Sequence, residues 1–170
     1  EYLWELQAAD GSWLDGDPDT TGLALVALMS SGQLGLAHPG LQAALGFLEA
    51  TQLPGGGWRP AWDTEPLNVN STAWAVQALL ACGYAPTDVP WRGSAPAEAL
   101  LQAQQADGRL GGTYANAYST VEGLLGLAEA PLFLTPALRV QRGLAWLATQ
   151  AREPGLTTGM AVDIALAYTS

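Results

Sequence analysis

The chain has 170 residues, of which 49% are hydrophobic and 13% charged, and no run of eighteen apolar residues. This composition predicts one globular domain over residues 1–170, with no helix inserted in a membrane. The formal net charge is −10, which excludes nucleic acid and anionic lipid surfaces as expected partners because both repel an acidic surface. Both ends of the chain fall at predicted helices, so we expect the domain to be a fragment of a longer protein.

A glutamine followed six positions later by a large apolar residue occurs four times in the chain. The glutamines lie 45, 52 and 46 residues apart, and the segments are Gln7–Trp13, Gln52–Trp58, Gln104–Leu110 and Gln150–Leu156. A repeat of this period predicts one supersecondary unit that buries its apolar face by stacking on its own copies. We expect the glutamine and the aromatic residue to be structural, since a glutamine at a helix end can satisfy backbone groups of the following loop.

Each glutamine is predicted to close an outer helix that is half exposed. Ahead of Gln52, apolar residues recur with helical spacing, and Pro39 suits the first turn; the stripe is Leu41, Ala44, Leu45 and Leu48. Ahead of Gln150 the stripe is Val140, Leu144 and Leu147, with Pro136 at the start. His38, beside Pro39, is expected to mark the entry to its helix.

A second set of segments is apolar almost all round, which predicts inner helices buried on every side. The segments are Thr20–Ser31, Ser71–Cys82, Ser119–Leu127 and Thr158–Tyr168. The hydroxyl, acidic and amide residues expected to cap them are Asp19–Thr21, Asn70–Thr72, Ser119–Thr120 and Thr157–Thr158. Gly32 and Gly83 are placed to end two of these helices. The fold class is therefore predicted as all-α, an array of four helical hairpins.

The glutamine segments resemble the QW repeat of prenyltransferase and squalene-oxidase type proteins. The first residues of two inner helices resemble the same family; they are Asp19–Leu28 and Asn70–Leu79. The resemblance implies the α/α toroid that is shared by terpenoid cyclases, protein prenyltransferase β subunits and cobalamin carriers. Four hairpins are fewer than a closed ring of this family uses, so the array would be partial, or would pair with another copy as a homo-oligomer. The resemblance also implies a bacterial protein that is secreted or held at the cell surface.

Two acidic residues interrupt the inner helices. Aligning Thr21, Thr72, Thr120 and Thr158 places Leu23, Trp74, Glu122 and Met160 at one equivalent position, and Val26, Gln77, Leu125 and Asp163 at another. Burying a lone carboxylate is costly. Glu122 and Asp163 are therefore each expected either to have an arginine or backbone partner, or to face a wet cavity that holds a ligand.

Aromatic residues gather near the predicted start of the inner helices, where they suit a planar or sugar-like ligand. The expected ligand-binding set is Trp62, Trp74, Tyr114, Tyr118, Glu122 and Asp163, with loop packing as the alternative for the aromatic residues. Resemblance to cobalamin carriers implies a corrinoid ligand, and resemblance to cyclases an isoprenoid. No cofactor is expected, and one histidine with one cysteine, His38 and Cys82, cannot make a three-ligand zinc site.

Two other functions remain open. Asp17-Pro-Asp19-Thr20 resembles the D-x-D-D motif of class II terpenoid cyclases, and this resemblance implies Asp19 as a general acid that protonates an alkene. Helix capping and a cation site are the alternatives for Asp17 and Asp19. The other function is a protein-interaction module, which would show an exposed apolar patch. The preferred expectation is a non-catalytic module that binds a small molecule.

Overall fold

A computed structural model describes residues 2–31, 35–84 and 91–128, and in this part α-helices dominate and no β-strand forms. The helices are α1 (Tyr2–Glu5), α2 (Pro18–Ser30), α3 (Pro39–Thr51), α4 (Val69–Ala81), α5 (Pro96–Gln102) and α6 (Ala117–Ala128), with a 3-10 helix, η1, at Gly112–Tyr114. The all-α prediction is confirmed for these residues. The hairpin expected over residues 136–168 lies outside the described part.

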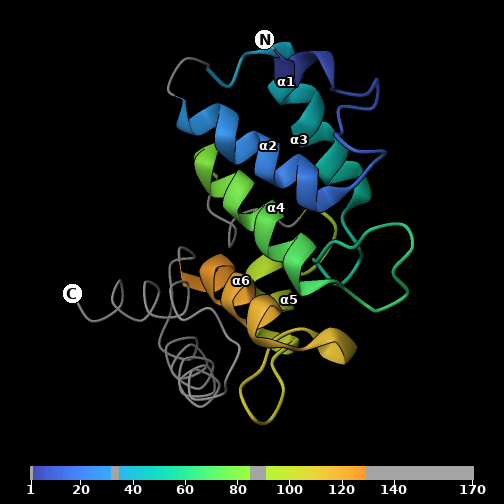
Figure 1. Ribbon diagram of the computed structural model, residues 1–170, viewed down its shortest axis with the longest axis vertical. Coiled ribbons are helices and arrows are strands. Elements are labelled where there is room, and N and C mark those ends of the chain that lie inside the picture. The colour runs from blue at the N-terminus through green and yellow to red at the C-terminus, as the bar shows by residue number, and fades with distance from the viewer. Residues whose placement is uncertain (1, 32–34, 85–90, 129–170) are drawn as a thin grey trace, which may run out of the picture.

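Helices α2, α4 and α6 form a row in which each packs on the next (Figure 1). We call this the inner row. Residues early in one helix meet residues early in the next, and later residues meet later ones, so the three helices run in the same direction. The pairs are Asp19–Ser71 and Gly22–Trp74 between α2 and α4, and Asn70–Glu122 and Gln77–Leu125 between α4 and α6. The three N-termini therefore lie at one end of the row.

Small residues let the helices of the inner row approach closely. A Cβ atom built on Gly22 would lie 2.7 Å from the backbone carbonyl of Trp74 in α4. On the other side of α4, a Cβ on Gly126 would lie 3.1 Å from the Cα atom of Ala73. The distance at Gly22 is shorter than real Cβ contacts, so glycine is required at that crossing, and a side chain at Gly126 would need α4 to move by a few tenths of an ångström.

The caps of the inner helices lie earlier than expected. Asp17 caps α2 by accepting a hydrogen bond from the Thr20 amide at 3.0 Å, and Asn68 caps α4 in the same way. The predicted starts at Thr20, Ser71 and Ser119 are thus each two residues late. Pro18 explains the shift in α2, because a proline at the first helical position leaves Asp17 as the cap. The predicted end at Gly83 is confirmed by its φ of +82°.

The glutamine of each of the three described repeats holds the loop that follows it. Its side-chain Nε2 donates to the carbonyl oxygen four residues later, at 2.9 Å for Gln7, 2.8 Å for Gln52 and 3.1 Å for Gln104. The indole N–H of Trp58 donates in turn to the carbonyl of Leu48 at 2.8 Å. These bonds confirm the structural role expected of the glutamine and the tryptophan.

A buried threonine in each of α2, α4 and α6 holds the same loop from the other side. The amides of Trp13, Trp58 and Leu110 donate to the Oγ1 atoms of Thr21, Thr72 and Thr120 at 3.1, 3.0 and 3.1 Å. All three threonines are fully buried. The loop between outer and inner helix is therefore fixed at both ends in every described repeat.

The outer helix α3 shows the predicted apolar stripe. Leu41, Ala44, Leu45 and Leu48 are all buried, where α3 packs on α2. His38 caps α3 through its Nδ1 atom, which accepts from the Gly40 amide at 3.2 Å, as its place beside Pro39 predicts. In the described ranges, no helix has the length and apolar character needed to cross a bilayer.

Candidate functional site

The N-terminal end of the inner row carries a cluster of polar and aromatic side chains, built around Glu122. Glu122 lies in the second turn of α6 and is 3% exposed. One carboxylate oxygen accepts a hydrogen bond from the indole N–H of Trp74 at 3.2 Å, and the other accepts from the side-chain amide of Asn70. Both partners lie in α4, so the carboxylate ties two helices together with side-chain donors.

Tyr118 completes the set of donors around Glu122. Its hydroxyl is hydrogen-bonded to the carboxylate, and this bond, with some burial, raises the pKa of Tyr118 to about 12. The ring itself remains 58% exposed. Glu122 thus has three neutral donors and, among the described residues, no arginine or backbone partner, which is the first of the two alternatives expected from sequence; the second is a wet cavity.

Asp19 of α2 reaches the same cluster from the other side of α4. Burial is the main reason that its pKa rises to about 6, and the nearby carboxylates of Asp17 and Glu122 raise it further. The Ser71 hydroxyl of α4 lies close enough to offset part of this rise. The cluster therefore spans all three helices of the inner row. We call it the N-terminal cluster, and its members are Asp19, Asn70, Ser71, Trp74, Tyr118 and Glu122.

Most members of the N-terminal cluster occupy two positions of the repeat. Two residues before Thr21, Thr72 and Thr120 stand Asp19, Asn70 and Tyr118, and two residues after Thr72 and Thr120 stand Trp74 and Glu122. On α4 and on α6 the two positions are four residues apart, so they lie on the same face, one turn from each other. Ser71 lies beside them, directly before Thr72.

A small cavity adjoins the cluster between α4 and α6. Its volume is about 100 Å³, and its lining includes Trp74, Gln77 and Glu122. Gln77 donates a hydrogen bond from its side chain to the carbonyl of Leu125 at 2.9 Å, which joins the two helices at the far side of the cavity. A volume of this size admits a small functional group.

Three of the six expected ligand-binding residues meet in the structure: Trp74, Tyr118 and Glu122. Trp62 and Tyr114 are exposed, by 72% and 54%, in segments outside the inner row. The Thr113 hydroxyl next to Tyr114 donates to the Glu65 carboxylate at 2.5 Å, which links the loop that carries Trp62 to η1. No interaction joins Trp62 or Tyr114 to Glu122 within the described ranges. Asp163 lies outside them.

The structure separates the two acids of the cyclase-like motif. Asp17 is the cap of α2, and one of its oxygens is bonded to both the amide and the hydroxyl of Thr20. Asp19 is no cap, which corrects the capping expected of it. The raised pKa keeps the Asp19 carboxyl protonated up to about pH 6, which is the form that a general acid needs. Within the described residues, no three histidine, cysteine or acidic side chains are placed to hold a metal ion.

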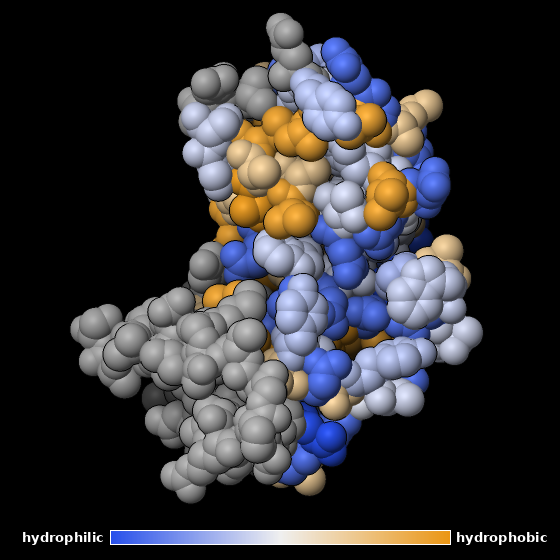
Figure 2. Space-filling model, in the orientation of Figure 1, coloured by the Kyte–Doolittle hydropathy of each residue, from blue (hydrophilic) through white to orange (hydrophobic). Residues whose placement is uncertain are grey.

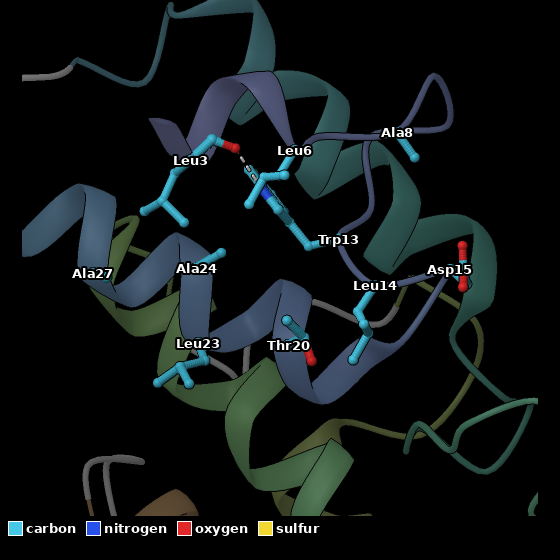
Figure 3. A pocket seen from close by; sticks show the side chains of 10 residues that line it. All are labelled: Leu3, Leu6, Ala8, Trp13, Leu14, Asp15, Thr20, Leu23, Ala24 and Ala27. Atoms are coloured by element: carbon cyan, nitrogen blue, oxygen red, sulfur yellow. Dashed lines mark hydrogen bonds between the residues drawn. The ribbon is translucent and has the colours of Figure 1, made fainter. Parts of the chain in front are cut away.

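An apolar groove with a volume of about 580 Å³ runs along the opposite side of α2 (Figure 3). Leu3, Trp13 and Leu23 are among its lining residues, and Trp13 is held there by a 2.7 Å hydrogen bond from its indole to the Leu3 carbonyl. Figure 2 shows hydrophobic side chains gathered on this part of the surface. Leu14 and Leu23 are 70% and 48% exposed.

The groove corrects the expectation that every inner helix is buried on all sides. The face of α2 that lines the groove carries Thr20, Leu23, Ala24 and Ala27, which align with Ser71, Trp74, Ala75 and Ala78 of α4. On α4 that face packs on α2. In the described part of the chain no helix covers it on α2, so an apolar helix is left half exposed.

No protein-family model matches the chain, and no solved structure matches it.

Proposed function

We propose that this chain is a non-catalytic module that binds a small molecule at the N-terminal cluster of the inner row. The observation that carries the proposal is the buried carboxylate of Glu122. Three donors from two helices hold it beside a cavity. Converging polar groups with aromatic neighbours at one end of a helical array are typical of ligand sites.

The proposal includes an α/α-toroid type of architecture, in which the inner row curves and continues beyond the described helices. The parallel inner helices support it, and so do the glutamine and threonine bonds that recur in the three described repeats. Ligand pockets for whole drug-sized molecules measure about 300–1,000 Å³. The cavity of about 100 Å³ therefore favours a ligand that inserts one small group there. A corrinoid or an isoprenoid would extend outward over the exposed ring of Tyr118.

Native mass spectrometry of the purified chain, with and without added cobalamin, tests the proposal. A mass excess in the untreated sample, or uptake of one cobalamin per chain, is the expected result. The matched variant is Trp74→Phe, which keeps an aromatic ring but removes the donor to Glu122; it is expected to lose most of the bound mass. If the measured mass equals that of the chain alone and does not change when cobalamin is added, a corrinoid is excluded as the ligand. A bound mass that Trp74→Phe and Glu122→Gln both retain would place the ligand elsewhere.

The groove along α2 favours a second candidate, a protein-interaction module. The equivalent face of α4 packs on α2, the inner helix of the preceding repeat, so the groove fits an apolar helix of similar shape. Exposed apolar surface of this kind commonly marks an interface. The partner proposed is a second copy of this chain, in line with the homo-oligomer expected from sequence.

Light scattering coupled to size-exclusion chromatography tests the second candidate. The wild-type chain is expected to run as a dimer, and Leu23→Glu as a monomer, because the charge would be placed inside the groove. Leu36→Glu is the control, since Leu36 is exposed outside the groove and the change of charge is the same. A wild-type monomer over a hundredfold range of concentration would contradict the dimer.

A further inference from the structure

A pocket with a volume of about 430 Å³ lies between α5, η1 and the loop that leads into α4. Polar residues that line it are Glu65 of the loop, Gln102 of α5, and Gln105, and Gly112 of η1 also contributes. Among the described residues, it shares no lining with the cavity beside Glu122 or with the groove along α2. A volume of this size is typical of sites that hold a whole small molecule.

The polar groups of this pocket are a carboxylate and amide side chains. Oε1 of Glu65 accepts a hydrogen bond from the Thr113 hydroxyl at 2.5 Å, whereas Oε2 has no hydrogen bond within the described residues. A Cβ atom built on Gly112 would lie 3.7 Å from this Oε2, so the free oxygen lies at the pocket wall. Gln102 and Gln105 add amide groups, each with a donor and an acceptor. A 2.7 Å hydrogen bond from Gln105 to the Gly112 carbonyl orients one of these amides.

These groups suit a ligand that carries hydroxyl groups and no charge. A hydroxyl donates and accepts, so it can pair with the carboxylate of Glu65 and with an amide at the same time. An anion would be repelled by Glu65 and by the net charge of −10, and no basic side chain lines the pocket within the described residues. A cation would leave the amide N–H groups without an acceptor. The rest of the lining includes Pro66, Leu67 and Val69, which can cover the C–H face of a ring.

Two exposed aromatic rings stand on the segments that border the pocket. Tyr114 is 54% exposed and lies in η1 with Gly112, and Trp62 is 72% exposed and lies in the loop with Glu65. The hydrogen bond from Thr113 to Glu65 joins the two segments. Tryptophan is highly buried on average, so a ring that is mostly in solvent calls for a partner. Aromatic rings beside polar groups are suited to stack on the C–H faces of sugars.

A buried carboxylate fixes the loop that carries Trp62. Asp63 is 3% exposed, and it accepts hydrogen bonds from the Glu65 amide at 2.9 Å and from the Asn68 side chain at 2.7 Å. The Arg59 guanidinium donates to the carbonyl of Glu65 in the same loop. A loop that is already held in place loses little entropy when a ligand binds. The exposed ring of Trp62 therefore stands on a preformed surface.

We propose that this pocket is a second ligand site, which binds a neutral carbohydrate. Sugar hydroxyl groups pair with Glu65, Gln102 and Gln105, and Tyr114 and Trp62 stack on sugar rings. Two aromatic rings on separate segments each take one sugar ring, so the ligand is an oligosaccharide. This site goes beyond the small-molecule module proposed above, and it does not depend on a ligand at the N-terminal cluster.

An oligosaccharide array probed with the purified chain tests the ligand class. The array carries neutral oligosaccharides of glucose, mannose, galactose, xylose and N-acetylglucosamine, together with sulfated and uronic acid oligosaccharides. The expected result is binding to at least one neutral oligosaccharide and none to the anionic ones. Absence of binding to every neutral oligosaccharide, or stronger binding to the anionic ones, would overturn the inference.

Calorimetric titration of variants with the neutral oligosaccharide that binds most tightly tests the location. Tyr114→Ala is expected to lose about tenfold or more in affinity, and Gln102→Ala about three- to tenfold. The matched control is Tyr2→Ala, which should keep the affinity, since Tyr2 is 71% exposed in α1, outside the pocket. All three side chains are exposed, so none of the changes empties the core. Equal affinities in the three variants would overturn the inference, because the oligosaccharide would then bind elsewhere.

Discussion

Gly22 of α2 and Trp74 of α4 are in close contact within the inner row. A Cβ on Gly22 would lie 2.7 Å from the backbone carbonyl of Trp74, whose own side chain continues to Glu122 on α6. Trp74 is thus in contact with both neighbouring helices. The spacing of α2 from α4 and the position of the indole in the N-terminal cluster are set by the same residue.

Gly22→Ala is expected to destabilise the fold by about 1–3 kcal/mol, because the methyl group must push α2 away from the backbone of α4. Gly46→Ala in α3 is the control, since a Cβ there meets nothing within 4 Å. The control should gain about 0.5–1 kcal/mol from helix propensity. Urea unfolding followed by tryptophan fluorescence measures both changes. A stability equal to wild type in Gly22→Ala would show that the row is less tightly packed than described.

Thr72→Val is expected to cost about 1–3 kcal/mol of unfolding free energy, although the two side chains have the same shape. The hydroxyl of Thr72 accepts from the buried amide of Trp58 at 3.0 Å and donates to the carbonyl of Asn68 at 2.7 Å. Valine leaves that amide without a partner. Thr64→Val, at an exposed position, should stay within about 0.5 kcal/mol of wild type. The comparison uses the same urea unfolding curves, and equal costs at the two sites would contradict the role of Thr72.

Asp19→Asn is expected to stabilise the chain above pH 6 by about 1–2 kcal/mol. The folded chain binds the Asp19 proton more tightly than the unfolded chain, since the pKa rises from 3.8 to about 6. Wild-type stability therefore falls between about pH 4 and 6 as Asp19 becomes charged. A shift of this size corresponds to about 3 kcal/mol, and solvent screening of the partly buried side chain reduces it. Asparagine is compatible with this position, because Asn70 occupies it in the next repeat.

The measurement is the difference in unfolding free energy between Asp19→Asn and wild type at pH 4, 5, 6 and 7. The difference isolates Asp19 from the other groups that face it: Asp17 on α2, Ser71 on α4, and Tyr118 and Glu122 on α6. It should grow with pH up to about 6 and then level off. Asp15→Asn, in an exposed loop, should give a difference that does not follow this curve. A flat curve for Asp19→Asn would show that the carboxyl is well solvated.

The sequence is sufficient to predict the helices and the loop contacts of the glutamines, because both follow from local rules. The spacing of Leu41, Ala44, Leu45 and Leu48 can be satisfied only by a helix with one buried face, and the structure has it. A glutamine at a helix end has few partners other than the next loop. The exposed face of α2 could not be predicted in this way, since an apolar helix does not reveal which of its sides lacks a neighbour.

The N-terminal cluster was only partly predictable, for a similar reason. Glu122 is a carboxylate at a repeat position where the other repeats have apolar side chains, which indicates that it has polar partners or a ligand. Trp74 stands at the same position of the preceding repeat. Asp19 and Asn70 are explained equally well as helix caps from sequence alone. Their true role depends on helices that start two residues earlier, which turns both side chains toward the neighbouring helix. A shift of two residues at a helix start is within the ordinary uncertainty of a boundary, but it decides the direction of a side chain.

Glu122→Gln is expected to cost about 1–3 kcal/mol of unfolding free energy at pH 7. The carboxylate accepts with both oxygens, from Trp74 and from Asn70, whereas a glutamine keeps one acceptor oxygen and turns an NH2 group toward the other partner. Glu49→Gln, at an exposed position on α3, should remain within about 0.5 kcal/mol of wild type. The substitution also removes a charge that raises the pKa of Asp19. The pH-dependent part of the stability should therefore move below pH 6. Loss of stability without this change in its pH dependence would mean that Glu122 and Asp19 do not interact electrostatically. The N-terminal cluster would then be two separate sites.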